Sequence, residues 1–539
     1  MIGLALMKKN GLELLVSSKV LGGSCLVIQE PLICRFLVFT IGCIESYVGL
    51  DVYYLFKIMN ITKIKRIIHK KVWSLLGPLY HFSWGLFANL LYHAPSNKLI
   101  VIGVTGTTGK TTSVYLIAKM LNAAGYKTGF TSTAMFNDGE KEWLNNKKMT
   151  MVGRLFTYQI LAKMVKNGCR FAVVETSSEG IIQYRHRFIN YDLIICTGLY
   201  PEHIESHGSF EKYREAKGML FAHLKDCRTK YANQHFGVQR VEAGLKKLAL
   251  NRVRKTVIVN GDDEHKDYFL SFWAETKWQY RLVPNAVDVK LNPNEDKDHN
   301  FHEAVATNIS VAADGTSFTI CQGGVCTNER FHLHLIGAFN VNNAMTAVSV
   351  GLALGLPLAT IKQGLESVSG VPGRLEMLET KLNFGVIVDY AFEPHAVSRL
   401  YETLLLLPHN RIIHILGSAG GGRDVSRRPI LGHLAGEQAD VVIVTNEDPY
   451  DDDPTIIIDQ VALGAEKAGK ILGENLFKIH DRREAIARAL VLADFGDIVL
   501  ITGKGNEQAI CVANGKKIPW DDRVVAREEI DKLKQQNSH

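Results

Sequence analysis

A loop rich in glycine and threonine carries the residues best suited to nucleotide chemistry. It lies between an apolar segment and a helical pattern and consists of Thr105, Gly106, Thr107, Thr108, Gly109, Lys110, Thr111 and Thr112. Backbone N–H groups of such a loop bind phosphate oxygens, the lysine neutralises the β- and γ-phosphates, and the hydroxyl after it suits Mg²⁺. The strict pattern G-x-x-x-x-G-K-[ST] fails at one position, because Val104 stands where its first glycine is required. The sequence therefore predicts a nucleotide site with a variant phosphate loop.

The variant loop resembles that of the Mur ligase and folylpolyglutamate synthase superfamily, and further motifs follow in the family's order over residues 98–530. The motifs are Glu175 to Gly180 with Gln183 and Arg185, the stretch 200–208 around His203, Tyr213 to Lys217, Gly337 to Asn343, Gly373 and Arg374, Val388 to Ala391, Gly421 to Asp424, and Gly503 to Glu507. Each is weak alone, but their shared order is specific. The pattern is most similar to the third-step Mur ligases, which form UDP-N-acetylmuramoyl-tripeptide.

The resemblance implies an ATP-dependent amide ligase of peptidoglycan precursor synthesis. Such an enzyme adds a diamino acid, L-lysine or meso-diaminopimelate, to UDP-N-acetylmuramoyl-L-alanyl-D-glutamate through an acyl phosphate. ATP converts the acceptor carboxylate into a good electrophile, and Mg²⁺ holds the triphosphate and screens its charge. ATP and Mg²⁺ are thus the expected cofactors, and the muramoyl-dipeptide and an amino acid the expected substrates.

The resemblance also assigns the catalytic and metal-binding residues. Lys110, Glu175, His203 and Lys217 are the expected catalytic residues. Thr111, Glu175, His203 and Lys217 are the expected metal ligands, Lys217 as its carbamate, because an unmodified ammonium would be repelled by Mg²⁺ whereas a carbamate supplies an anionic oxygen. Without the resemblance, Glu175 reads as a surface carboxylate, His203 as a structural histidine and Lys217 as a solvated helix lysine.

The remaining expected contacts divide between nucleotide and substrates. Besides the loop itself, the expected ATP-binding residues are Asn340, Asn343, Arg374 and Asp389. Either asparagine could instead cap a helix. Arg374 and Asp389 would meet the nucleotide when the domains close. The expected substrate-binding residues are Thr150, Ser177, Gln183, Arg185, Arg423, Asp424, Asp448, Gly503 and Glu507.

Three positions depart from the family pattern near the amino-acid end. The diaminopimelate-adding enzymes carry D-N-P-R, whose arginine grips a distal carboxylate in a bidentate manner, whereas this chain has Tyr450 in that place. Phe392 replaces the usual histidine after D-Y-A, and Asn506 replaces that of G-K-G-H-E. L-lysine, which lacks a second carboxylate, therefore becomes competitive as the substrate.

The elements that must position these residues alternate between strand and helix. A strand at 99–104 and a helix at 111–124 flank the loop, and further strands are expected at 171–175, 193–197, 256–260, 386–390, 411–417, 441–445 and 498–502. This pattern predicts an α/β fold: a central phosphate-loop domain at 98–371 with a mostly parallel sheet, and a C-terminal Rossmann-like, doubly wound domain at 372–539. An apolar and basic helical leader, 1–97, precedes them.

Composition supports a folded enzyme and argues against a nucleic-acid partner. The 539 residues are 46% hydrophobic and 22% charged, which is typical of globular proteins. Residues 1–97 hold ten Lys and Arg against four acids, so 98–539 hold 52 against 51 and have no broad basic surface. The nine scattered cysteines include no C-x-x-C pair, so neither a disulfide framework nor a zinc site is expected. A reducing cytoplasm and a monomer are expected.

The leader replaces the family's first, uridine-binding domain and departs most from the pattern. The uncharged run 72–93 is long enough to span a bilayer, but it equally suits an interfacial helix or packing on the next domain. Residues 59–97 are the expected membrane contact, at the inner face of the membrane, and Met59 is an alternative start that would leave 1–58 untranslated. The alternatives are a superfamily ligase with a polyglutamate-type or lipid-linked acceptor, and a membrane scaffold that binds ATP without turnover.

Overall fold

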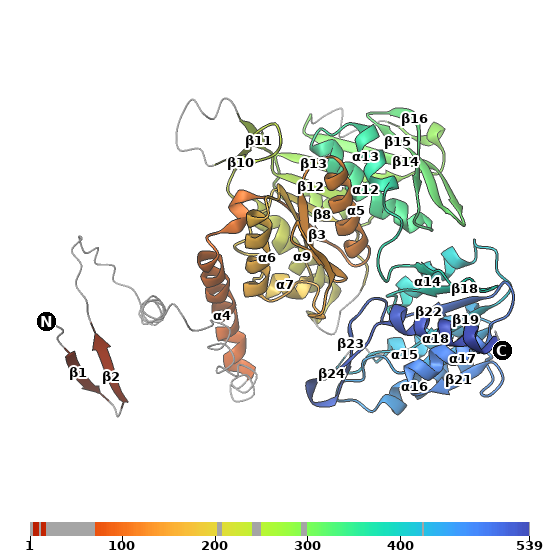
Figure 1. The fold of residues 1–539 in the computed structure, drawn as a ribbon. Coiled ribbons are helices and arrows are strands. Elements are labelled where there is room, and N and C mark those ends of the chain that lie inside the picture. Colours follow the sequence, from red (N-terminus) through yellow and green to blue (C-terminus); the bar gives the residue numbers. More distant parts are fainter. Residues whose placement is uncertain are drawn as a thin grey trace. The chain divides into compact units, whose positions relative to one another are not determined.

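The computed structural model describes most of the chain as two separate units. The described residues are 4–9, 12–17, 70–201, 207–239, 250–290, 292, 299–422 and 425–537. Contacts divide the chain at Leu75, so that residues 1–75 and 76–539 form the two units. Figure 1 shows the elements of both.

The first unit contains a short antiparallel hairpin. Strands β1 (Leu4–Lys9) and β2 (Leu12–Ser17) pair from Leu4 opposite Ser17 to Lys9 opposite Leu12. The sequence predicted a helical leader and did not anticipate these strands. The alternative start at Met59 lies outside the described residues.

Helix α4 (Lys70–Leu91) covers nearly all of the uncharged run, and its second half packs in the larger unit. Ala88 is fully buried, and Phe82 meets Phe188 edge to face with ring centroids 4.9 Å apart. A Cβ on Gly85 would lie 3.0 Å from the Phe188 ring, so glycine permits this close approach. Within the described part of the chain, no helix is long and apolar enough to cross a membrane. The structure thus favours the interpretation that the uncharged run packs on the next domain.

An eleven-stranded sheet forms the core of residues 100–333. Its strands, in spatial order, are β16 (Val325–Leu333), β15 (Gly315–Gln322), β14 (Phe301–Ala312), β13 (Thr276–Leu282), β12 (Thr256–Asn260), β8 (Leu193–Cys196), β3 (Ile100–Thr105), β7 (Phe171–Glu175), β4 (Thr128–Thr131), β5 (Met135–Asn137) and β6 (Glu142–Leu144). Strands from β14 to β4 run parallel, and both edges continue antiparallel. The strands predicted near 99–104, 171–175, 193–197 and 256–260 are confirmed.

Two apolar layers cover this sheet because side chains of a strand alternate between its faces. Ile100, Ile102 and Val104 of β3 pack in one core cluster, whereas Leu99 and Val101 belong to the other. The first cluster includes helices α5 (Lys110–Ala123), α12 (Ala338–Ala353) and α13 (Leu358–Glu366); the second includes α6 (Arg154–Lys166), α7 (Ser178–Ile182), α9 (Phe210–Leu224) and α10 (Lys266–Leu270). Burial on both faces explains why the central strands are continuously apolar.

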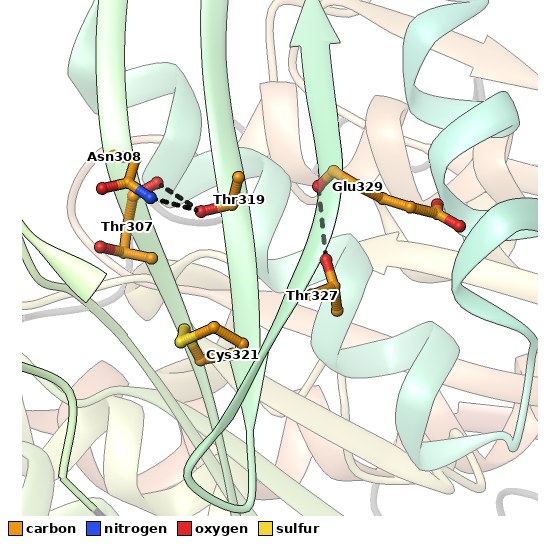
Figure 2. The surroundings of a disulfide bond; sticks show 7 residues. Thr307, Asn308, Thr319, Cys321, Thr327 and Glu329 are labelled. Atoms are coloured by element: carbon orange, nitrogen blue, oxygen red, sulfur yellow. Dashed lines mark hydrogen bonds between the residues drawn. A yellow bond between two sulfur atoms is a disulfide. The ribbon is translucent and has the colours of Figure 1, made fainter. Parts of the chain in front are cut away.

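The antiparallel edge of the sheet contains a disulfide bond that the sequence did not predict. Cys321 of β15 and Cys326 of β16 form a disulfide across a tight hairpin, with their Cα atoms 3.8 Å apart. Figure 2 shows this bond beside the polar side chains of the neighbouring strands. The sequence predicted no disulfide framework and did not anticipate this single bond, because cysteine spacing alone was considered, whereas strand register brings these two residues face to face.

A second, six-stranded sheet forms the C-terminal part. Its order is β17 (Glu376–Leu378), β18 (Gly385–Val388), β22 (Ile498–Ile501), β19 (Ile412–Leu416), β20 (Val441–Thr445) and β21 (Leu476–Ile479), parallel except for β17. Helices α14 (Pro394–Leu404), α15 (Arg427–Gln438) and α16 (Pro454–Lys467) cover one face, and α17 (Arg482–Leu492) and α18 (Asp522–Asn537) the other. The predicted doubly wound arrangement is confirmed.

Candidate active site

One cavity of about 430 Å³ collects most of the predicted site residues from both sheets. Those that line it are Thr107, Thr108, Gly109, Lys110, Thr111, Thr112, Thr150, Glu175, Ser177, Arg185, Asn340, Asn343, Arg374, Asp389, Asp448, Gly503 and Glu507. Residues after the carboxyl ends of parallel strands meet at one edge of a sheet, which is where α/β proteins bind ligands. Four predicted residues do not line the cavity: Thr105, Gly106, Gln183 and Lys217. Three more lie outside the described residues: His203, Arg423 and Asp424.

The phosphate loop joins β3 to α5 in a conformation that requires its glycines. Gly106 and Gly109 have φ angles of 144° and 76°, a region that favours glycine. A Cβ on Gly109 would lie 2.2 Å from Oδ1 of Asn343, so the loop and α12 touch. Lys110 begins α5, and its ammonium donates to the Thr107 carbonyl at 2.7 Å. The lysine is thus held over the loop whose N–H groups suit phosphate.

Glu175 ends β7 and reaches the start of α5. Its Oε2 accepts from the Thr111 hydroxyl at 3.0 Å and from the Thr133 backbone at 2.7 Å. The Thr133 hydroxyl donates to Oε1 at 2.8 Å and also forms a hydrogen bond with the Thr150 hydroxyl at 3.0 Å. A carboxylate and a hydroxyl beside a phosphate loop are the hard oxygen donors that suit Mg²⁺ together with substrate phosphates. In the described ranges, no three His, Cys, Asp or Glu side chains could hold a metal by themselves.

Lys217 of α9 is buried against the back of the phosphate loop. Its ammonium donates to the Gly106 carbonyl at 2.7 Å and lies 4.5 Å from the centre of the Tyr213 ring. Tyr213 in turn hydrogen-bonds the Thr107 hydroxyl at 3.2 Å. The reading of Lys217 as a solvated lysine is therefore wrong, because the side chain is inside the protein and next to the loop.

The predicted adenine residues lie on α12, and the predicted closure residues lie beside β17 and β18. Asn343 donates to Asn340 at 3.0 Å, and Asn340 donates to the Ile336 carbonyl at 2.9 Å. Arg374 stacks on the Tyr390 ring at 4.3 Å and reaches the Thr111 hydroxyl at 3.5 Å. Burial raises the pKa of Asp389. Its carboxylate accepts from the backbone N–H groups of Leu375, just before β17, and Ala391, just after β18.

The residues predicted for the acceptor form a wall beyond Thr150. Ser177 caps α7 by accepting from the Gly180 backbone at 3.2 Å. Arg185 donates to the side chain of Gln183 at 2.7 Å and to the carbonyl of Met151. This wall connects the Glu175 end of the cavity to the start of α6.

The end of the cavity that the sequence predicts for the amino acid carries two acids and two lysines. Lys504 donates to Asp448 at 2.9 Å and to Glu507 at 2.5 Å. Lys148, from the other sheet, reaches Asp448 at 2.8 Å and Glu507 at 3.1 Å. Burial acts to raise the pKa of Asp448, but the two lysines outweigh it and lower that pKa. Asp448 is therefore charged, and its carboxylate is suited to an ammonium group.

Glu447 adds a third acid to this end. Glu447 lies beside Gly503. A Cβ added at position 503 would lie 2.5 Å from Glu447 Oε2, so glycine permits this close contact. That oxygen is buried and, among the described residues, has no hydrogen-bond partner. Burial raises the pKa of Glu447, although Lys504 opposes the shift. An incoming N–H donor would satisfy this oxygen.

Sequence reasoning missed Lys148 and Thr133. Neither belongs to a motif with a fixed spacing, and Lys148 meets Asp448 across 300 residues of chain. Lys148 has a φ of 52°, and a non-glycine residue held in this region often marks a functional site. That signal exists only in the structure.

Comparison with known proteins identifies the family of this chain. The Mur ligase middle domain matches residues 104–283, and the Mur ligase glutamate ligase domain matches residues 373–505. The UDP-N-acetylmuramyl-tripeptide synthetase of Roseiflexus sp. (strain RS-1) is 34% identical over 448 residues, which are 83% of this chain and 81% of the relative. The UDP-N-acetylmuramoyl-L-alanyl-D-glutamate--2,6-diaminopimelate ligase of Bacillus cereus is 32% identical over 453 residues, which are 83% of this chain and 81% of the relative.

Solved structures agree on the fold. A UDP-N-acetylmuramoyl-L-alanyl-D-glutamate--2,6-diaminopimelate ligase matches with a TM-score of 0.51 and 26% identity, covering 81% of this chain and 79% of the other. The Mycobacterium tuberculosis folylpolyglutamate synthase complexed with ADP matches with a TM-score of 0.55 and 19% identity, covering 79% and 91%. The chain has the phosphate loop, both family domains and relatives of this similarity. It therefore belongs to the Mur ligase family of ATP-dependent amide ligases.

Proposed function

We propose that this protein joins a diamino acid, L-lysine or meso-diaminopimelate, to UDP-N-acetylmuramoyl-L-alanyl-D-glutamate with hydrolysis of ATP to ADP and phosphate. The observation that carries the proposal is one cavity with the Thr111–Glu175 pair beside a phosphate loop at one end and the Asp448–Glu507 acid pair at the other. The first suits phosphoryl transfer, and the second suits the ammonium of the incoming amino acid. Relatives named for this reaction support it.

The two halves of the reaction divide between two proposed domains, 98–371 and 372–539. The first binds ATP through its loop, with Lys110 against the phosphates and Asn340 or Asn343 at the adenine. An acceptor carboxylate oxygen attacks the γ-phosphorus, ADP leaves, and the acyl phosphate forms. The amine of the amino acid then attacks the acyl carbon, inorganic phosphate leaves, and the amine loses a proton as the amide forms. Arg374, which reaches Thr111, and Asp389 would meet the nucleotide when the domains close.

The residues beside the loop fit a bound Mg²⁺, which would neutralise charge on the transferring phosphate. Thr111 and Glu175 would hold it, with His203 as a further ligand. We propose that Lys217 is carbamylated, its neutral amine adding to CO₂ with release of a proton. The carbamate N–H can still donate to the Gly106 carbonyl, 2.7 Å from the nitrogen, and the two carbamate oxygens supply the negative charge that suits Mg²⁺. The burial of Lys217 supports this assignment.

The substrates would lie along the cavity wall. Thr150, Ser177, Gln183 and Arg185 are the proposed acceptor contacts; Arg423, Asp424, Asp448, Gly503 and Glu507 are the proposed contacts at the amino-acid end. Tyr450 occupies the place of the carboxylate-binding arginine, so L-lysine remains competitive with meso-diaminopimelate.

The test is phosphate release by the full chain with ATP, Mg²⁺, the UDP-muramoyl-dipeptide and one of the two amino acids, with the product identified by mass. A product with either amino acid supports the proposal and assigns the pocket. Tight ATP binding without product from either would refute this acceptor and favour another superfamily ligase, with a polyglutamate-type or lipid-linked acceptor.

Localisation and association are separate proposals. We propose a cytoplasmic monomer that touches the inner membrane face through residues 59–97. Exposed apolar side chains on α4, including Leu79, Leu90 and Leu91, support this contact. Sedimentation with anionic and neutral vesicles would test it, and no sedimentation with either would refute it.

A further inference from the structure

Lys148 places an ammonium group of the chain itself at the end of the cavity predicted for the amino acid. The residue comes from the segment between β6 and α6, and its Nζ lies 2.8 Å from Asp448 and 3.1 Å from Glu507. Burial acts to lower the pKa of Lys148, but Glu507 and then Asp448 outweigh it and raise that pKa. Lys148 is therefore charged, and it contacts the acids that would receive a substrate ammonium.

The same two acids have a second partner in the C-terminal part of the chain. Lys504 lies 2.9 Å from Asp448 and 2.5 Å from Glu507. Two carboxyl groups thus face two ammonium groups, and a third ammonium at this place would be repelled by both lysines, because like charges a few ångströms apart repel strongly where water is excluded. A substrate ammonium can therefore contact these acids only if one lysine leaves.

Lys148 is the lysine that is better placed to leave. The side chain of Lys504 is fully buried, whereas Lys148 lies outside any helix or strand and has exposed residues on both sides, Lys147 and Met149. Its φ of 52° is a conformation that costs free energy in a residue other than glycine. The Asn145 side chain holds this turn by donating to the Met149 carbonyl at 3.0 Å. The Lys148 side chain can therefore turn away while the backbone of the turn stays in place.

A diamino acid carries the group that could take the place of Lys148. Its reacting amine must face the acyl phosphate at the phosphate-loop end, so its second amine faces Asp448 and Glu507. A free ammonium has three N–H donors and can turn to any acceptor nearby. Glu447 also lines this end, and its Oε2 lacks a partner among the described residues. An uncharged side chain, by contrast, would leave the acids without the ion pair that it broke, which is costly in a buried site.

We propose that Lys148 is an internal competitor of the substrate, whose ammonium occupies the place of the second ammonium of a diamino acid and yields it only to a side chain with a positive charge. Lys148 is thus a specificity-determining residue that excludes amino acids with uncharged side chains. The inference rests on the proposed function for the class of substrate. It leaves the chemistry of the phosphate loop untouched.

The experiment compares the full-length wild type with Lys148→Met, Lys148→Gln, Lys148→Arg and the control Lys147→Met. Lys147 is adjacent but exposed. The probes are L-lysine and L-norleucine, which has the same carbon chain without the second ammonium. Calorimetry measures the dissociation constant of each probe for protein saturated with Mg²⁺, a non-hydrolysable ATP analogue and the UDP-muramoyl-dipeptide. L-lysine is the probe whichever diamino acid is turned over, because it has a second ammonium and no second carboxylate.

The competitor model predicts opposite behaviour for the two probes. We expect Lys148→Met and Lys148→Gln to lower the dissociation constant of L-lysine by about tenfold, since one freed charge-assisted contact is worth about that factor. The dissociation constant of L-norleucine should not fall, because these variants leave the acids with less counter-charge beside an apolar side chain. Lys148→Arg keeps the competing charge, so it and Lys147→Met should stay within about threefold of wild type for both probes.

Two results would overturn the inference. An equal fall for both probes would show that Lys148 blocks space and does not compete as a charge. An unchanged or higher dissociation constant for L-lysine in both uncharged variants would show that Lys148 does not compete at all. Equal affinity for the ATP analogue shows that each variant is folded, and if one uncharged variant fails this check, the other is used.

Turnover separates this inference from the proposed function. If wild type forms product with a diamino acid but the uncharged variants bind L-lysine no more tightly, the inference alone is refuted. If wild type forms no product with either diamino acid, the proposed function is refuted, and the inference with it.

Discussion

Lys148 should control the choice of amino acid, and Lys148→Met tests this. The ammonium of Lys148 contacts Asp448 at 2.8 Å and Glu507 at 3.1 Å, and its side chain is only 7% exposed. With Lys504 it balances the two acids. Replacing it by methionine keeps most of the apolar part of the side chain and makes the pocket more negative by one unit charge.

The size of the effect follows from Coulomb's law. At about 4 Å and an effective dielectric constant of about 20, one unit charge changes the energy of another by about 4 kcal/mol. Relaxation and water take up much of this, so we expect about 1.4 kcal/mol, which is about tenfold. The extra negative charge attracts the side-chain ammonium of L-lysine and repels the distal carboxylate of meso-diaminopimelate. The preference for L-lysine should therefore rise by about tenfold or more.

The assay is the ratio of kcat/KM for the two amino acids, or of their inhibition constants where one is not turned over. A ratio cancels any general loss of activity caused by weaker contact between the two sheets. Lys147→Met is the matched control, because Lys147 is adjacent and exposed. A ratio within about threefold of wild type, or a shift toward meso-diaminopimelate, would refute the reasoning.

Three further results are expected. Lys110→Ala should lower kcat by at least about a hundredfold, because it removes the ammonium held over the phosphate loop; a near-normal turnover rate would contradict this role. Lys217→Ala should abolish turnover, and the wild type in ¹³C-labelled bicarbonate should give a carbamate NMR signal that Lys217→Ala lacks; equal signals would exclude the modification. Burial, and then repulsion from Arg482, lowers the pKa of His414 to about 3. The unfolded chain therefore binds a proton that the native chain does not, and stability should fall by about 1.4 kcal/mol per pH unit below about pH 6.5. His414→Gln should flatten this slope in denaturant titrations, and an unchanged slope would argue against this histidine.

Local sequence was sufficient for the phosphate loop and for the parallel strands. Gly106, Gly109 and Lys110 act within a few residues of one another, so their spacing alone predicts the loop. The strands 171–175, 256–260 and 441–445 are continuous apolar runs, as expected where both faces of a sheet are covered. Edge strands are less clearly patterned, so the β14–β16 extension and the Cys321–Cys326 bond were not foreseen.

The sequence by itself determined the α/β class, the nucleotide loop and the family, because each depends on residues close together or in a fixed order. The tertiary structure decided which distant charges meet. Lys148 meets Asp448, 300 residues later, and Arg154 meets Arg185 around Gln183. Such contacts depend on how the sheets and helices pack, and packing energy depends on burial and shape that no local pattern encodes. The amino-acid pocket and the arginine pair are therefore properties of the folded chain.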